Sequence, residues 1–282
     1  MSAQVPDPGR LPAHTHYRRF SREERLLHGF LMFSFVGLAF TGLPLLFSHE
    51  PWAATLARFL GGFESAGTIH RACAIVMMGV FTVHLSRIVR RLFLQKDLTI
   101  LWGPTSMVPQ PRDVLEMVAH IRWFVGAGPH PRFEHFTYWE KFDYWAVFWG
   151  MGIIGTSGLI LWVPETFAYV VPGWVFNIAS LIHGEEALLA VVFIFTFHFF
   201  TGHLRPEKFP MDSVIFTGRV TVKEMEEERP DEYERLRRTG RLDELASPAA
   251  PRWVYRLGRT VGGIAVVLGL LMVAMIVFAE LK

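Results

Sequence analysis

Cysteine is nearly absent from this chain, and its absence excludes several kinds of site. Cys73 is the single cysteine among 282 residues. One thiol cannot close an internal disulfide, hold an iron–sulfur cluster by itself, or supply the Cys-x-x-Cys-His attachment motif of c-type cytochromes. We interpret Cys73 as a small buried apolar residue.

Signal-peptide features are also missing from the beginning of the sequence. Residues 1–20 are polar, contain Pro6, Pro8 and Pro12, and include no apolar segment of signal-peptide length. We therefore expect residues 1–25 to form a tail that stays in the cytoplasm.

Long apolar runs dominate the rest of the chain, which is 51% hydrophobic overall. A helix needs about 20 apolar residues to cross a hydrocarbon layer of about 30 Å. Runs near or above this length occupy 26–47, 69–94, 144–163, 181–203 and 254–279. The sequence predicts an all-α membrane protein with a four-helix transmembrane bundle over 26–203 and a fifth, C-terminal transmembrane helix over 254–282.

Positive charge is unevenly distributed, although the net charge is only +2. Of 28 Lys and Arg residues, all but Arg58, Arg71 and Lys282 lie in the N-terminal tail, in or beside the connection after the second run, or between 205 and 259. Loops retained in the cytoplasm carry the excess of Lys and Arg. We predict a protein of the bacterial cytoplasmic (inner) membrane, with a cytoplasmic N-terminus and a periplasmic C-terminus, and no nucleic-acid binding.

Three connecting segments have recognisable patterns. Residues 111–125 place apolar side chains at helical spacing, which predicts a helix lying on the inner membrane surface in contact with lipid. Within the charged cytoplasmic segment 204–253, residues 221–245 predict a solvated surface helix. On the outer side, 165–178 is apolar but interrupted by Pro172 and Gly173, which makes it a candidate docking surface.

Histidines within the apolar runs are the main functional signal, because ionisable side chains are costly inside a membrane. His70 and His84 are 14 residues apart, and His183 and His198 are 15 apart. At about 1.5 Å and 100° per residue, each pair shares one helix face and is separated by roughly 21 Å. Both helices cross in the same direction, so His70 is expected level with His183, and His84 with His198. Two imidazoles at matching depth can bind both axial positions of a heme iron.

His28 and His203 allow three different assignments of the inner site. His28 replaces His84 as the partner of His198, or His28 and His203 hold a third heme, or both line a quinone pocket. The sequence thus predicts two b-type hemes, or three. We expect the middles of the runs to hold no carboxylate, which favours hemes over a metal-free proton path. The remaining polar-segment histidines are predicted to be ordinary surface residues: His14, His16, His120, His130 and His135.

Glycines recur along two of the runs. They stand at 37 and 42 in the first run and at 150, 152, 155 and 158 in the third. Glycine would let a porphyrin lie against a helix, and it would equally allow close helix packing.

Short motifs in the first four runs resemble one known family. They are Glu24-Arg25-Leu26-Leu27-His28, Leu38-Ala39-Phe40-Thr41-Gly42, Ile69-His70-Arg71 and the His183/His198 pair. Their order and spacing resemble the bacterial cytochrome b subunits of formate dehydrogenase (its gamma subunit), NiFe-hydrogenase and thiosulfate reductase, over about 20–210. The resemblance implies that His70 and His183 hold an outer heme b, and that His28 and His198 hold an inner one. His84 departs from the formate dehydrogenase pattern and is similar to the spacing in the cytochrome b of bc-type complexes, so the inner pair stays open.

The resemblance also implies partners. Residues 212–219 and the fifth run resemble b-type subunits that work beside multiheme c-type cytochromes. The implied function is electron transfer between the quinone pool and a periplasmic redox subunit, either a multiheme c-type cytochrome or an iron–sulfur protein. Menaquinone or ubiquinone is expected near the inner heme.

Quinone chemistry also moves protons. Glu140, Asp143 and Tyr144, at the inner start of the third run, are candidate quinone-site residues, and Arg71 is a candidate partner for a heme propionate. Two other functions remain open, namely a freestanding b-type quinone oxidoreductase and a cofactor-free transporter or membrane anchor.

Overall fold

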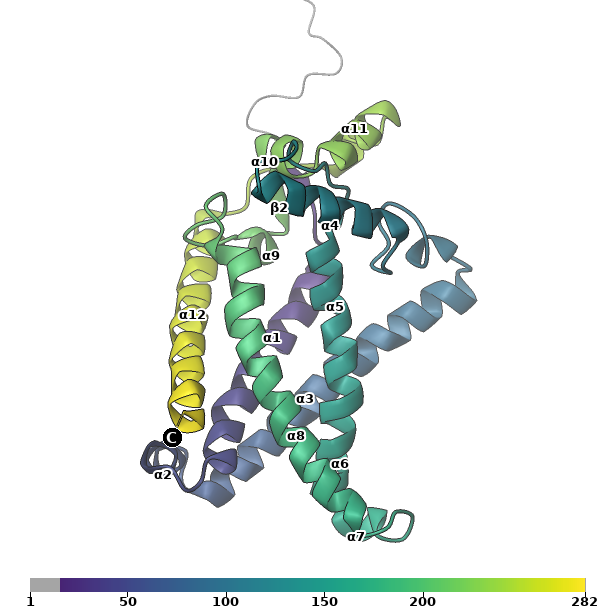
Figure 1. Ribbon diagram of the computed structural model, residues 1–282. Coiled ribbons are helices and arrows are strands. Elements are labelled where there is room, and N and C mark those ends of the chain that lie inside the picture. Colours follow the sequence, from purple (N-terminus) through teal and green to yellow (C-terminus); the bar gives the residue numbers. More distant parts are fainter. Residues whose placement is uncertain (1–15, 282) are drawn as a thin grey trace, which may run out of the picture. The chain divides into compact units, whose positions relative to one another are not determined.

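The computed structural model describes residues 16–281, and helices dominate this part of the chain (Figure 1). Within it, the helices long and apolar enough to cross a membrane are Arg22–Leu46, Phe63–Leu94, Tyr138–Trp162, Trp174–Leu204 and Arg252–Glu280. The predicted all-α membrane fold with five spans is confirmed. The chain divides into two compact units, which we call the membrane unit and the polar unit.

The spans are built from α-helices with short π-helical turns. The first span is α1 (Arg22–Leu46), and the second joins α3 (Phe63–Val89) to η1 (Arg90–Leu94). The third contains α5 (Tyr138–Gly150), η3 (Met151–Gly155) and α6 (Thr156–Trp162). The fourth contains α8 (Trp174–Phe193), η4 (Ile194–His198) and η5 (Phe200–Leu204), and the fifth is α12 (Arg252–Glu280). Two short helices, α2 (Pro51–Phe59) and α7 (Pro164–Phe167), lie in the connections.

The membrane unit comprises residues 26–97, 142–212 and 259–281 of the described chain. Its buried apolar cluster joins α1, the α8–η4 segment and α12, which run beside one another in Figure 1. Phe195 belongs to this cluster and is 1% exposed. A Cβ at Gly269 would lie 2.1 Å from the Phe195 ring. The fifth span therefore packs directly on the bundle, and a glycine makes that approach possible.

The polar unit comprises residues 16–25, 98–141 and 213–258. A three-stranded antiparallel sheet lies at its centre, with β1 (His16–Arg18) between β2 (Arg219–Thr221) and β3 (Ala246–Ser247). Its helices are η2 (Leu98–Ile100), α4 (Pro111–Phe124), α9 (Val214–Thr217), α10 (Val222–Glu228), α11 (Pro230–Arg238) and η6 (Asp243–Leu245). The apolar core contains Tyr17, Val220, Met225, Leu236 and Leu242.

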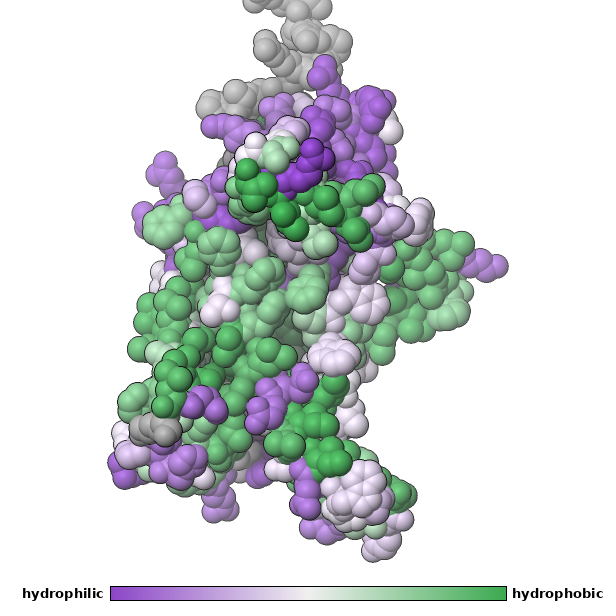
Figure 2. All heavy atoms as spheres, in the orientation of Figure 1, coloured by the Kyte–Doolittle hydropathy of each residue, from purple (hydrophilic) through white to green (hydrophobic). Residues whose placement is uncertain are grey.

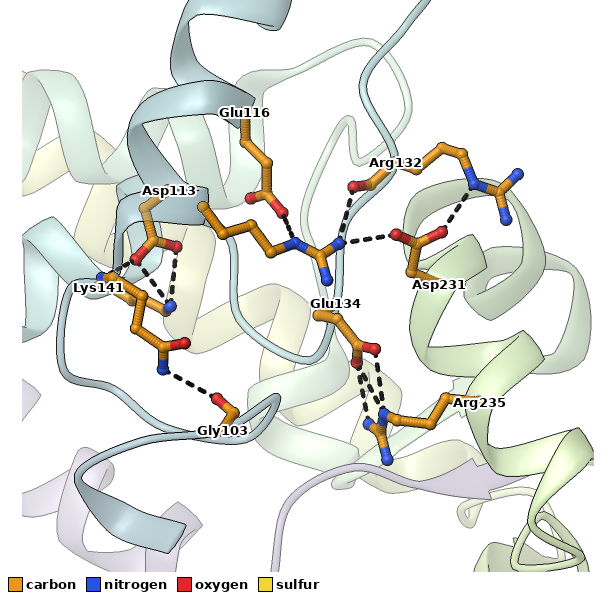
Figure 3. Close-up of polar contacts among 10 residues, drawn as sticks. Gly103, Asp113, Glu116, Arg132, Glu134, Lys141, Asp231 and Arg235 are labelled. Carbon is orange, nitrogen blue, oxygen red and sulfur yellow. Dashed lines mark hydrogen bonds and ion pairs between the residues drawn. The ribbon is translucent and has the colours of Figure 1, made fainter.

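Ion pairs connect distant segments of the polar unit (Figure 3). Arg235 of α11 binds Glu134 at 2.9 Å. Asp231 accepts from Arg112 of α4 and from Arg132, both at 2.7 Å. These pairs tie α4 and the segment 128–137 to α11, although about a hundred residues separate the partners in sequence. The charged segment is therefore a folded part of this unit and not only a solvated helix.

The prediction of ordinary surface histidines was wrong for His120. His120 is 9% exposed and stacks on Phe124 with ring centroids 4.6 Å apart, because aromatic side chains of the segment 120–139 surround it. His130 is exposed, as predicted, although its ring packs against Trp123. His16 lies in β1, so the predicted tail contributes a strand, and His14 lies outside the described residues.

His135 is the clearest case. It hydrogen bonds to Glu232 of α11, a residue only 4% exposed. Burial, and next the positive charge of Arg19, lower the pKa of His135. Burial alone would raise the pKa of Glu232, but the His135 hydrogen bond and the nearby Arg19 and Arg229 hold it below its usual value. The pair is a buried part of the unit's core.

Candidate functional site

His70 and His183 face each other inside the membrane unit. His70 comes from α3 and His183 from α8, and their ring centroids are 6.3 Å apart with the rings inclined by 75°. The two side chains therefore lie next to each other in the bundle, as their spacing predicted.

The ring of His70 is held by the first span. The Thr41 hydroxyl donates to the carbonyl of Gly37 at 2.7 Å, so its oxygen is left to accept from His70 Nδ1 at 3.1 Å. The backbone carbonyl of Leu38 also accepts from His70. A Cβ on Gly42 would lie 3.1 Å from His70 Cε1. The first span thus fixes the ring through its Nδ1 side and leaves room beside it with a glycine.

The ring of His183 is held in the same way by the third span. Its Nδ1 donates to the carbonyl of Ile154 at 3.0 Å and lies 3.3 Å from the Ser157 hydroxyl. Ser157 in turn donates to Ile153 at 2.7 Å, so its oxygen is available as an acceptor. A Cβ on Gly158 would lie 2.9 Å from His183 Cε1.

The groups that hold His70 and His183, in residues 38–42 and 154–158, repeat one local pattern, and we call each group a cradle. In 38–42 and in 154–158 a residue whose carbonyl interacts with the histidine is followed three residues later by a hydroxyl and then by glycine. Metal-bound histidines commonly donate their second ring N–H to such acceptors, which fixes the tautomer. With Nδ1 of His70 and His183 protonated, each Nε2 carries the lone pair that a metal needs. The residues present therefore fit an axial ligand pair for a heme iron.

π-Helical turns occur beside these contacts. The carbonyl of Ile154 belongs to η3, His198 ends η4, and His203 lies in η5. Such turns are rare and frequently mark functional sites.

The inner histidines have charged and unpaired polar neighbours. His198 Nδ1 lies 3.0 Å from Asp143 Oδ2. Asp143 Oδ1 and His203 Nδ1 are buried without a hydrogen-bond partner among the described residues. His28 lies within electrostatic range of both His198 and His203. Unsatisfied buried polar atoms call for a water or a bound group, so this region also fits a ligand.

His84 differs from the other three deeply placed histidines. Its Nε2 lies 2.9 Å from the Tyr144 hydroxyl, and its ring packs edge-on against Tyr144 and Phe148. The nitrogen that His70, His183 and His198 leave for a ligand is therefore engaged in His84.

Two candidate residues make other contacts. Glu140 lies in the polar unit, where it binds Arg229 at 2.9 Å and Arg19 at 3.5 Å. The backbone and hydroxyl of Thr137 also donate to it. Arg71 is exposed and donates to Thr68 one turn earlier on α3. Both side chains therefore have protein partners, and Arg71 also lies within electrostatic range of His70.

The expectation that the spans hold no central carboxylate was wrong. The fourth helical span begins at Trp174, earlier than its apolar run, so Glu185 and Glu186 lie well inside it. Glu186 accepts a hydrogen bond from Trp149 Nε1 at 3.1 Å. The run-based boundary at residue 181 missed about two turns of helix, because residues 174–180 are less uniformly apolar.

A membrane bundle that pairs histidines across its interior defines the class of membrane cytochromes. Residues 19–216 match the family described as prokaryotic cytochrome b561. The chain belongs to this family, which confirms the predicted resemblance to hydrogenase and formate dehydrogenase cytochrome b subunits. It is a multi-pass membrane cytochrome that transfers electrons through heme b, with four spans in the matched region and a fifth after it. No curated protein matches the chain.

Proposed function

We propose that this cytochrome transfers electrons between the membrane quinone pool and a partner redox subunit on the periplasmic side. The observation that carries the proposal is the pairing of His70 and His183 at 6.3 Å, with each Nδ1 side held by the other spans. Heme supplies reversible one-electron transfer when it is bound. The histidines and their cradles position that group within the bundle.

Two hemes account for the histidines best. We assign His70 and His183 to the outer heme, and His28 and His198 to the inner one. The contact between His84 Nε2 and Tyr144 favours His28 over His84 as the inner partner. The Asp143 carboxylate orients His198, as acidic residues often do for metal-bound histidines.

Quinone chemistry is assigned to the inner region because proton-exchanging groups gather there. Asp143 has one carboxylate oxygen on His198 and one without a described partner. His203 adds a buried ring nitrogen, and Tyr144 adds a hydroxyl. A quinol gives up protons with its electrons, so an acceptor must stand near its ring. We propose Asp143 as that acceptor, with Tyr144 and His203 as hydrogen-bonding groups. Glu140 is the weaker candidate, because two arginines already bind it.

The partner subunit is assigned to the opposite end of the spans. Tyr169 and Val170 are exposed in the connection between the third and fourth spans, and Trp174 is exposed at the beginning of the fourth span. Tyr169 is 91% exposed. Exposed apolar patches of this kind mark protein interaction sites. A multiheme c-type cytochrome or an iron–sulfur protein docked there would lie near the outer pair. Arg71, which is exposed and follows His70 on α3, is available to a heme propionate.

The orientation of the chain follows from charge. The Lys and Arg residues outside the spans concentrate in the polar unit, and retained loops carry such charge. We propose that the polar unit and the N-terminus are cytoplasmic, and that the C-terminus is periplasmic.

A reduced-minus-oxidised absorption spectrum of the purified chain, with pyridine hemochrome quantitation, tests the proposal. Two b-type hemes per polypeptide support the assignment above. Three would instead make His28 and His203 a ligand pair, and a chain without heme would overturn the proposal.

A further inference from the structure

Helix α4 (Pro111–Phe124) exposes apolar side chains along one side. This apolar side of α4 consists of Val114, Leu115, Val118, Ile121 and Phe124, together with Val125 directly after the helix, and these residues are 48% to 72% exposed. Figure 2 shows hydrophobic atoms gathered over this helix. A helix that folds onto a protein in water buries such a side.

The opposite side of α4 is polar and buried, which reverses the usual pattern. Asp113, Glu116 and His120 are each less than 10% exposed. Each has a partner within the polar unit: Lys141 binds Asp113 at 2.8 Å, Arg112 binds Glu116 at 2.6 Å, and Tyr138 binds His120 at 3.0 Å. Figure 3 shows the first two of these contacts. Protein groups bind each of these three side chains, although Glu116 Oε2 is buried without a partner among the described residues. The apolar side is the one left for the surroundings.

Two of those contacts fix α4 beside the beginning of a membrane span. Tyr138 and Lys141 belong to the first turn of α5, with which the third span begins. Trp139 of the same turn packs on His120 with centroids 5.3 Å apart. Helix α4 is therefore attached, within the polar unit, to the first turn of the helix that forms the third candidate span.

The exposed apolar surface continues beyond α4 in the preceding segment. Leu98 and Trp102 are each 65% exposed. Trp side chains are enriched where a bilayer meets water. At the other end of the helix, Arg122 is exposed, and interfacial helices use such cations against phosphate headgroups.

We propose that the apolar side of α4 is inserted among the acyl chains of the same membrane that the five spans cross. The occupant of this surface is lipid, because the buried polar side of α4 binds the first turn of α5, with which a membrane span begins. The inference goes beyond electron transfer and does not depend on which histidines hold heme.

Site-specific fluorescence quenching of the heme-loaded, full-length protein tests it. Cys73 is the only native cysteine, so a Cys73→Ala background carries one introduced cysteine at a time. The reporter positions are Val118→Cys and, as a second variant, Leu115→Cys on the same side. Glu227→Cys on α10 is the control, because the Glu227 side chain is 65% exposed within the polar unit. Each is labelled with an environment-sensitive fluorophore in nanodiscs of phosphatidylethanolamine and phosphatidylglycerol that hold one copy.

The expected result separates the two kinds of position. Labels at 118 and 115 should be quenched by spin labels on the acyl chains and protected from iodide, and the label at 227 should behave in the opposite way. Iodide quenching of 118 and 115 as strong as that of 227 would overturn the proposal. Protection of both labels from both quenchers would also overturn it, because protein would then cover the surface. The heme absorption spectrum of each variant shows that it has folded.

Discussion

The outer and inner histidine sites of the membrane unit are held by different chemical groups. At the outer pair, backbone carbonyls and the hydroxyls of Thr41 and Ser157 hold the rings of His70 and His183. At the inner region, a carboxylate contacts His198, and buried polar atoms lack partners among the described residues. The outer contacts carry no titratable group, whereas the inner ones include Asp143.

This difference separates two tasks that one cytochrome must perform. A site that passes only electrons is served by neutral, fixed acceptors, because they hold the ligand rings without exchanging protons. A site that oxidises or reduces a quinone also needs groups that take up and release protons. The contrast supports our proposal of electron delivery at the outer pair and proton-coupled chemistry at the inner region, and each prediction below tests one part of that proposal.

The largest effect is expected at the outer pair. His183→Ala removes one proposed axial ligand, and a b-type heme has no covalent bond to hold it in place. Heme content should fall from about two to about one per polypeptide, measured by pyridine hemochrome. Leu189→Ala, on the exposed side of the same helix, is the matched control and should keep full heme. Unchanged heme in His183→Ala would remove His183 from the ligand set.

The inner assignment is tested by comparing two histidines. His28→Ala should lose the inner heme, whereas His84→Ala should retain it because His84 Nε2 already binds Tyr144. Low-temperature absorption spectra resolve which heme is lost in each variant. The reverse outcome would assign His84, and not His28, as the partner of His198.

A substitution at Asp143 is expected to leave heme content unchanged but to slow the reaction with quinol. Asp143→Asn keeps an oxygen that accepts from His198 Nδ1, so both hemes should remain. The amide cannot take up a proton, so quinol-dependent heme reduction should slow by about 10²–10⁴. Stopped-flow absorption measures this rate. Ser157→Ala, which alters the outer cradle alone, is the comparison and should leave the quinol rate unchanged; equal slowing in both variants would contradict the division of tasks.

The fold was largely predictable from the sequence, because each span is a long apolar run and the backbone must satisfy its own hydrogen bonds in lipid. The boundaries were less predictable. The third helix begins at Tyr138 and the fourth at Trp174, each several residues before its apolar run. Those extra turns are rich in aromatic and polar residues, which a hydropathy pattern does not count as membrane.

The contacts of the polar unit were not predictable from local patterns. His135 and Glu232 meet across 97 residues, and Arg235 meets Glu134 across 101. In the membrane unit, the depth pairing of His70 with His183 followed from helix geometry, but the roles of Thr41 and Ser157 did not. The repeated hydroxyl-glycine step in 38–42 and 154–158 is the sequence signal that marks both cradles. The ligand roles of the histidines stay predictions.

The smallest expected effect concerns the glycine that faces the outer pair. A Cβ on Gly158 would lie 2.9 Å from His183 Cε1 and 3.3 Å from Nδ1. The ring cannot move away freely, because Ile154 and Ser157 hold it. Overpacking of this kind costs about 1–3 kcal/mol, so Gly158→Ala should weaken heme retention at the outer pair by about fivefold to 150-fold.

Gly152→Ala is the control for this change, because a Cβ there meets no described atom within 4 Å. Alanine favours a helix over glycine by about 1 kcal/mol, so the control should retain heme at least as well as the parent chain. Heme transfer to excess apomyoglobin measures retention in all three proteins. Equal loss from both alanine variants would mean that glycine serves helix packing in general and not the ring of His183. If Gly158→Ala alone loses heme, and loses it only from the outer pair, then the outer site depends on close packing around the ring of His183. The inner site would differ from it, because there the contacts include the Asp143 carboxylate.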